Sequence, residues 1–263
     1  MMRLVICICL FFFTLVSCNN NEVNKNDTVS GQEKQLRDMI NSYPDSLPLR
    51  NKLVEYFADN NDYTSAIKET NLLIQKDSNN AGHWDTKARL LFLNGDTLGA
   101  INAFQSAIEI FPEPQYVISL GTLYAQTKNQ LALEMADALL QAPKANATLQ
   151  AFFIKGLYYN YTGDKVAAIP FFDKCLSLDY TFMDAYREKA IALYDMAKYE
   201  DAIQLLVKAT TVQRTFDEAW YWMGRCYQKL NKNKEAIESY RLALQIDPDY
   251  VEAKDALGKM GVK

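Results

Sequence analysis

The stretch DEAWYWMGRCYQKLNKNKEAIESYRLALQIDP, residues 217 to 248, spaces small and aromatic side chains in a way that returns along most of the chain. Small side chains allow helices to approach closely, and large rings fill the space around such contacts. A regular return of this spacing therefore indicates a repeated packing unit. The marker residues of the stretch are Trp220, Met223, Gly224, Tyr227, Ala236, Tyr240 and Pro248.

The same spacing is found again at steps of 34 residues toward the N-terminus. The place of Ala236 is taken by Ala202, Ala168, Glu134, Ala100 and Ala66, and that of Gly224 by Ala190, Gly156, Thr122, Ala88 and Val54. Two copies depart from the pattern. In the third, Leu120 and Gly121 stand one residue early and the segment LALEMADALLQ is out of register. The first copy lacks an aromatic residue at its fourth position.

This pattern resembles the tetratricopeptide repeat (TPR), with its W-x2-L-G-x2-Y, A-x3-F and P positions and its period of 34 residues. The resemblance covers residues 47 to 248. It implies an all-α fold, a right-handed α-solenoid of about six helical hairpins, because one hairpin cannot bury its apolar side alone. The expected repeats are residues 47–80, 81–113, 114–146, 149–182, 183–216 and 217–250.

Each end of such an array needs a cover against solvent. Residues 31 to 44 are expected to form a lone second helix ahead of the first repeat, with Leu36, Met39 and Ile40 on one face. At the other end, residues 250 to 263 are expected to form a charged cap helix. Residues 31 to 263 are therefore predicted to be a single solenoid.

The N-terminus combines a basic start at Arg3 with an apolar run from Leu4 to Val16. This run is shorter than the roughly 20 residues of a membrane span, so it favours a secretory signal peptide. Leu15-Val16-Ser17-Cys18 then resembles the lipobox of bacterial lipoproteins, which implies removal of residues 1 to 17 and lipidation of Cys18. An ordinary signal peptide and a short membrane anchor are the two alternatives.

Residues 18 to 30 are mostly polar and lack periodicity, which predicts a flexible tether behind the lipidated cysteine. Asn19 follows the cysteine, and by resemblance to the sorting rule of enteric lipoproteins this favours the outer membrane. The expected location is therefore a lipid-anchored position at the outer membrane, facing the periplasm.

Several classes of function find no support in the composition. The net charge is −4, which offers no basic face for nucleic acid. His83 is the only histidine, so no His/Cys cluster could hold zinc, and Cys175 and Cys226 fall at packing positions. No phosphate loop or nucleophile elbow occurs. The prediction is a protein that is not an enzyme and has no cofactor or metal.

The TPR resemblance implies that the first helix of each hairpin lines a concave groove that binds a peptide. The Lys and Asn clamp of chaperone-binding TPR proteins is absent from the corresponding positions. We expect an apolar partner segment, anchored by aromatic side chains and oriented by arginine–carboxylate pairs. The alternative is that some of these residues only pack helices together. The groove residues, assigned by phase, are Arg89, Phe92, Ile118, Phe153, Leu157, Asn160, Tyr161, Arg187, Tyr194, Tyr221 and Arg225.

These features together predict a protein-binding scaffold or adaptor for an envelope complex. The partner class includes secretion, pilus and peptidoglycan-remodelling components, because lipid-anchored TPR proteins serve such machines. The length and the number of repeats resemble those of pilotins, which help to assemble pilus secretins. The alternative function is a surface lipoprotein that captures a glycan or another small ligand through its aromatic residues.

Overall fold

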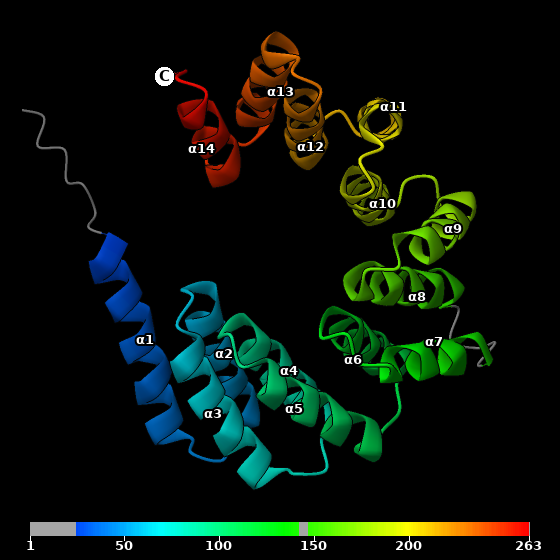
Figure 1. The fold of residues 1–263 in the computed structure, drawn as a ribbon. Coiled ribbons are helices and arrows are strands. Elements are labelled where there is room, and N and C mark those ends of the chain that lie inside the picture. The colour runs from blue at the N-terminus through cyan, green and yellow to red at the C-terminus, as the bar shows by residue number, and fades with distance from the viewer. Residues whose placement is uncertain (1–24, 142–146, 263) are drawn as a thin grey trace, which may run out of the picture.

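The computed structural model describes residues 25 to 141 and 147 to 262, and within these ranges the chain forms fourteen helices and no strand. Between α1 and α14 the helices form six hairpins, from α2–α3 to α12–α13 (Figure 1). The predicted all-α solenoid is therefore confirmed. The helices are α1 (Lys25–Ser42), α2 (Leu47–Asp59), α3 (Tyr63–Lys76), α4 (Ala81–Leu93), α5 (Thr97–Ile110), α6 (Pro114–Gln126), α7 (Leu131–Gln141), α8 (Thr148–Thr162), α9 (Lys165–Leu178), α10 (Met183–Asp195), α11 (Tyr199–Val212), α12 (Asp217–Lys229), α13 (Asn233–Ile246) and α14 (Val251–Lys259).

The turn inside each hairpin contains one residue with positive φ, which closes the first helix and starts the second. Five of these residues follow the 34-residue period: Asn61, Gly95, Gly163, Ala197 and Asn231. In the third hairpin the corresponding residue is Lys128, with φ 59°, one position before the period would place it. The early Leu120-Gly121 pair of the sequence is thus matched by an early turn.

Close packing inside the fourth and sixth hairpins depends on a glycine in the first helix and a ring in the second. A Cβ atom added at Gly224 would lie 2.6 Å from Cε1 of Tyr240, and one added at Gly156 would lie 2.6 Å from Cε1 of Phe172. Both rings are fully buried. No side chain larger than hydrogen fits these two positions unless the helices separate.

The third hairpin packs differently. Helix α7 buries Ala132, Ala136 and Leu139, two residues earlier than the period places its buried face, so that Glu134 is exposed. A Cβ atom on Gly121 would meet Cδ1 of Ile154, on the next hairpin, at 3.0 Å. Helix α6 therefore packs against α8 as well as against its own partner α7.

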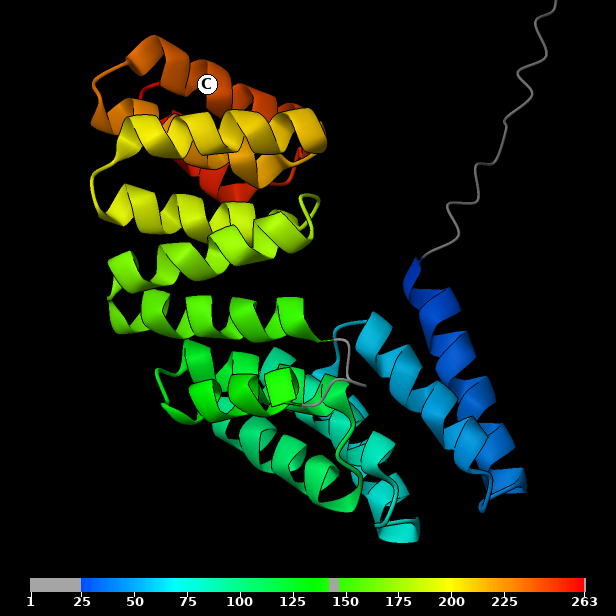
Figure 2. The same cartoon turned by 90° about the vertical axis from the view of Figure 1, so that its right-hand side faces the viewer.

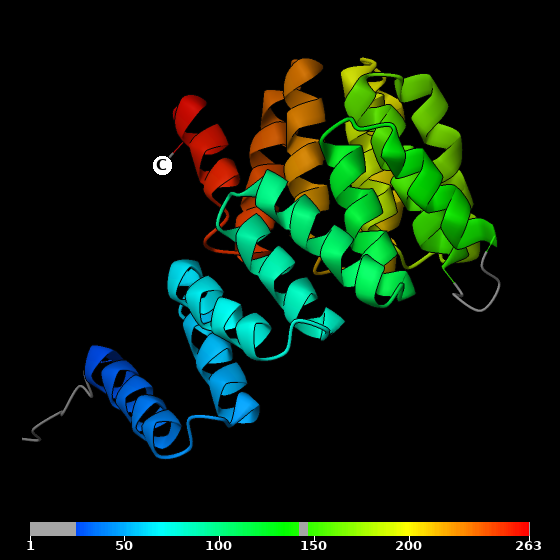
Figure 3. The same cartoon turned by 90° about the horizontal axis from the view of Figure 1, so that it is seen from below.

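The hairpins follow one another around a curve. Helices α4, α6, α8, α10 and α12 lie on its inner side, and α5, α7, α9, α11 and α13 lie on its outer side (Figure 1). Helices α8 to α13 run mostly across the view of Figure 2, whereas α1 to α5 run obliquely to them (Figures 2 and 3). The change of direction falls at the out-of-register third hairpin.

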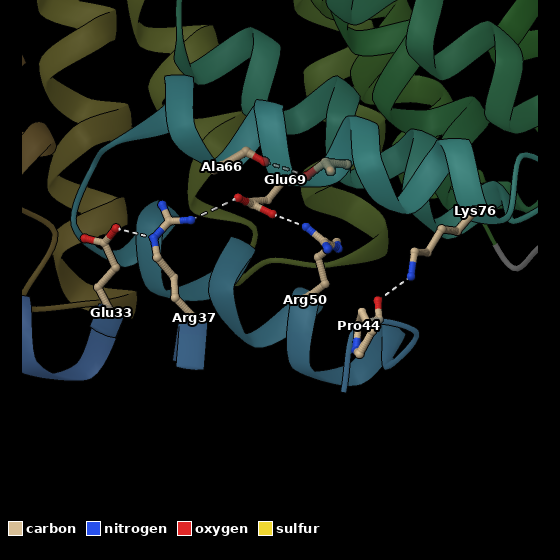
Figure 4. A network of polar contacts seen from close by, with 8 residues as sticks. Glu33, Arg37, Pro44, Arg50, Ala66, Glu69 and Lys76 are labelled. Atoms are coloured by element: carbon tan, nitrogen blue, oxygen red, sulfur yellow. Dashed lines mark hydrogen bonds and ion pairs between the residues drawn. The ribbon is translucent and has the colours of Figure 1, made fainter. Parts of the chain in front are cut away.

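The N-terminal cap is longer than predicted. Helix α1 begins at Lys25, so residues 25 to 30 are helical and do not belong to the predicted tether. The correction has a simple cause: packing of Leu36 and Ile40 on α2 nucleates the helix, and adding turns to a nucleated helix costs little. Polar contacts also fix α1, because Arg37 and Arg50 converge on buried Glu69 of α3 (Figure 4).

Cys18 and the predicted signal peptide lie outside the described residues. In the part of the chain that the structure covers, no helix is both long enough and apolar enough to cross a membrane.

Candidate functional site

All the predicted groove residues lie on the inner helices α4, α6, α8, α10 and α12. The structure does not join them into one continuous site. It divides them into three groups, at α4–α6, around α8–α10, and between α10 and α12. The arginine of each group has different contact partners.

The first group forms an apolar hollow between α4 and α6, with a volume of about 440 Å³. Three predicted residues meet there: Arg89, Phe92 and Ile118. Phe92 is 45% exposed and its neighbour Leu93 is 55% exposed, so two adjoining large apolar side chains are open to solvent here. Nε of Arg89 donates to Oδ2 of Asp85 at 2.9 Å, so this arginine already has a carboxylate. The remaining lining residues are Leu93, Phe104, Ser119, Thr122, Leu123 and Gln126. We call this set the α4–α6 hollow.

Two predicted groove residues on α8 are not available to a ligand, which corrects the prediction. Leu157 is 3% exposed and belongs to the core formed with α6. Asn160 is 4% exposed, and its amide is held between two neighbouring side chains. The phase placed both on the inner face, but the adjoining hairpins cover them. Phe153 is half-buried, with its ring centroid 4.9 Å from that of Phe182.

A polar network explains how Asn160 is used. Its Nδ2 donates to Oε2 of Glu188 at 3.1 Å, and its Oδ1 accepts from Nζ of Lys165 at 2.7 Å. Glu188 is 7% exposed. Burial raises the pKa of its carboxyl above the ordinary value, while Arg187 acts in the opposite direction. The network links α8, α9 and α10, so its first role is to hold these helices together.

Arg187 completes the network and is saturated with carboxylates. Its guanidinium lies 2.9 Å from Asp184, 3.3 Å from Glu188 and 3.0 Å from Glu218, the last on α12. These contacts fasten the fifth hairpin to the sixth. Tyr161 is nearby and 40% exposed, and its pKa is raised first by burial and then by the charge of Glu188.

The third group surrounds Arg225. The carbon of its guanidinium lies 4.7 Å from the ring centre of Trp222, 4.8 Å from that of Tyr194 and 6.0 Å from that of Tyr221. Its Nη2 donates to the hydroxyl of Tyr194 at 3.3 Å. We call these four residues the Arg225 cradle. Tyr194 and Tyr221 thus contact an arginine of their own chain.

Some residues of these groups were missed in the sequence. Trp222 stands in the run Trp220-Tyr221-Trp222, so an aromatic cluster was visible, but the repeat phase gave no reason to select its third ring. Glu188 looked like one more solvated acid among many. Only its burial in the assembled fold shows that it is structural.

The cysteine, histidine and acidic side chains of the described residues bear on catalytic and metal-binding roles. These residues contain no group of three or more His, Cys, Asp and Glu side chains placed to hold a metal ion. Cys175 and Cys226 are fully buried free thiols, and burial raises the pKa of both to about 12. Such thiols stay protonated and unreactive near neutral pH. His83 is 7% exposed.

Family models for the tetratricopeptide repeat match residues 149–182 and 217–250, which are the fourth and sixth of the expected repeats. A TPR repeat-containing protein of Methanocaldococcus jannaschii is 25% identical over 257 residues, covering 92% of this chain and 41% of the relative. Tetratricopeptide repeat protein 1 of Schizosaccharomyces pombe is 23% identical, covering 78% of this chain and 21% of the relative. The chain thus spans less than half the length of these relatives.

Two solved structures share the fold. A tetratricopeptide repeat protein from Parabacteroides merdae superimposes with a TM-score of 0.74 at 17% identity, covering 90% of this chain and 93% of that one. PilW, described as a widely conserved type IV pilus biogenesis factor, superimposes with a TM-score of 0.64 at 18% identity, covering 80% of this chain and 97% of that one. At these identities the likeness concerns the fold alone.

Proposed function

We propose that this chain, whose solenoid contains tetratricopeptide repeats, is a non-enzymatic protein-binding scaffold of a bacterial envelope. It holds an apolar segment of a partner protein against its concave face. The observation that carries the proposal is the α4–α6 hollow, where large apolar side chains are exposed on the inner side of the solenoid.

The physical argument is one of unused apolar surface. Phe92 and Leu93 lie in contact with water, although burying such a side chain fully is worth about 1.5–3 kcal/mol. A partner side chain that enters the hollow recovers part of this free energy without having to unfold the scaffold. The hollow lies between two rigid helices, so little conformational entropy is lost on binding.

The proposed location rests on the N-terminal sequence. Lipid chains on Cys18 would anchor the protein in the outer membrane with the solenoid in the periplasm, because several acyl chains together give stable anchoring. The proposed partners are components of secretion, pilus or peptidoglycan-remodelling machines. A pilus component is the first to test, because the fold neighbour PilW is described as a pilus biogenesis factor.

The binding proposal is tested by crosslinking in native membranes followed by affinity capture. Phe92→Glu and Leu93→Glu place a charge in the hollow and should abolish capture of the partner that the wild type enriches. Leu98→Glu is the matched control, because Leu98 is 69% exposed on α5 and does not line the hollow. Equal capture by all variants would assign binding to another surface.

The same preparation separates the scaffold from a glycan-capturing protein. A scaffold should enrich a defined protein and ignore polysaccharide. The glycan alternative would be favoured if the purified chain is retained on immobilised envelope polysaccharide without a protein partner and Phe92→Glu abolishes this retention.

The anchor is tested by metabolic labelling with palmitate. Wild-type protein should incorporate the label and sediment with outer membranes, whereas Cys18→Ser should do neither. Cys226→Ser serves as the control, because Cys226 is buried in the sixth hairpin. Unlabelled wild-type protein that is cut elsewhere would support an ordinary signal peptide.

A further inference from the structure

The concave arginines differ in one respect that bears on the partner. Arg89 is paired with Asp85, and Arg187 is paired with three carboxylates. Arg225 has no carboxylate within ion-pairing distance among the described residues, although its side chain is half-buried. A partly desolvated guanidinium without a counter-charge is held at a free-energy cost that an incoming anion would relieve.

The cradle also fixes the orientation of this guanidinium. The rings of Trp222 and Tyr194 lie within 5 Å of its carbon, and one N–H donates to the hydroxyl of Tyr194. Three aromatic rings surround the guanidinium, and one of its N–H groups is used by Tyr194. The remaining donors have no acceptor in the described part of the chain. These donors suit a carboxylate, which a guanidinium can bind through two parallel hydrogen bonds.

A hollow of about 300 Å³ lies beside Arg225 and is lined on two sides. Tyr221, Arg225 and Gln228 of α12 form one wall together with Tyr240 of α13. Helix α14 forms the other wall, and its lining residues are Glu252, Asp255, Ala256 and Lys259. Gln228 is itself fixed, because its Oε1 accepts from the hydroxyl of Tyr240 at 2.5 Å. The two walls therefore present charges of opposite sign, Arg225 on one and mainly carboxylates on the other.

We infer that the Arg225 cradle binds a carboxylate of the partner segment, and that a basic side chain next to this carboxylate faces Glu252 and Asp255. The inference rests on the proposed scaffold function and adds to it the chemistry of the partner. The α4–α6 hollow holds an apolar side chain of the partner. The hollow beside Arg225 binds one acidic and one basic group of the same partner segment. The carboxylate can come from an Asp or Glu side chain or from a chain end.

The test uses the purified intact chain and short fluorescein-labelled peptides whose affinity is measured by anisotropy. One pair carries Asp or Asn before a lysine and has an amidated end. The second pair has no acidic side chain and ends, after a lysine, in a free carboxylate or an amide. We expect the charged member of at least one pair to bind about tenfold more tightly than its neutral counterpart, as a charge-assisted contact provides. The pair that responds identifies the source of the carboxylate.

Variants then assign the preference to Arg225. Arg225→Gln should remove it and Arg225→Lys should reduce it, because an ammonium lacks the planar fork. Arg241→Gln is the matched control and should leave the preference intact, because Arg241 is exposed on α13 and lines neither hollow. Replacing the peptide lysine by leucine should weaken binding to the wild type but not to the Glu252→Gln/Asp255→Asn variant. Circular dichroism confirms that each variant is folded.

Two results would overturn the inference: equal affinity of the wild type for charged and neutral peptides in both pairs, or an unchanged preference in folded Arg225→Gln. The wild-type comparison needs no variant, so it holds even if Arg225→Gln fails to fold. If either result is found while Phe92→Glu still abolishes capture of the native partner, only the cradle is rejected. If capture is insensitive to Phe92→Glu while the cradle behaves as expected, the hollow is rejected and the cradle remains.

Discussion

Hairpins three and six carry the same repeat in two different forms. In hairpin six, α12 and α13 meet through Gly224 and Tyr240, and the helices are in phase with the rest of the chain. In hairpin three, Gly121 contacts Ile154 of the following hairpin, and the buried face of α7 is displaced by two residues. In the regular hairpin the tight glycine contact therefore lies inside the hairpin, whereas in the irregular one it reaches the next hairpin.

The irregular hairpin leaves apolar surface unused. The α4–α6 hollow opens beside it, and the solenoid changes direction at the same place (Figure 2). The comparison teaches that one opening of the inner face, the α4–α6 hollow, coincides with the break in the repeat. The hollow beside Arg225 shows that a regular hairpin can also leave an opening on this face.

The strongest way to break the comparison is to remove the ring of hairpin six. Tyr240→Ala should lower the free energy of unfolding by about 3–5 kcal/mol, because Tyr240 is fully buried and its loss leaves a cavity. The position three periods earlier, in hairpin three, is exposed Ala138, and Ala138→Ser should change stability little. Chemical denaturation followed by circular dichroism measures both, and equal effects would show that the two hairpins do not differ in packing.

A smaller effect is expected from the glycine opposite that ring. Gly224→Ala should destabilise the protein by about 1–3 kcal/mol, since the added methyl group lies 2.6 Å from a buried ring atom. Gly121→Ala should cost less, because its contacts with Cδ1 of Ile154 at 3.0 Å and Cβ of Met135 at 3.1 Å are longer than the 2.6 Å contact at Gly224. Gly258→Ala is the control.

No atom lies within 4 Å of the Cβ position of Gly258, so this substitution should stabilise helix α14 by up to about 1 kcal/mol through helix propensity alone. Thermal melts of the three variants measure their melting temperatures and so rank their stabilities. A Gly224→Ala variant as stable as the wild type would mean that the two helices separate without cost.

The smallest expected effect concerns helix capping. Hairpin six is the more regular of the two, but the start of its second helix lacks a side-chain cap. The side chains of Asp62, Asp96 and Asp164 cap the second helices of hairpins one, two and four, whereas Lys232 provides no such cap to α13. Lys232→Asp should therefore stabilise the protein by about 0.5–1 kcal/mol, through a capping bond and a favourable charge at the helix start. The rise in melting temperature should vanish below the pKa of the new carboxyl, and a rise that persists in acid would contradict the capping explanation.

Much of the fold followed from the sequence, because the repeat is a local signal. The period predicted six hairpins, and the early Leu120-Gly121 pair predicted the place where the register breaks. The start of α1 was predicted too late, because polar residues 25 to 30 carry no apolar periodicity and their helix depends on packing further along the chain.

The candidate site was less predictable. The phase placed Leu157 and Asn160 on the concave face as correctly as it placed Phe92, yet two are buried and one is exposed. Arg89 and Arg225 hold the same repeat position, yet only Arg89 has a carboxylate, Asp85, one turn away on its own helix. Arg187 stands at another repeat position, and the packing of α10 on α12 adds Glu218 to the carboxylates of its own helix.

The sequence by itself determined which helices form and how they pair, since spacing within about 34 residues sets the buried face of each hairpin. The tertiary structure alone decided which inner side chains remain open. Accessibility and ion pairing depend on how neighbouring hairpins stack. A shift of one or two residues in the register of a single hairpin exposes side chains that the regular register would bury.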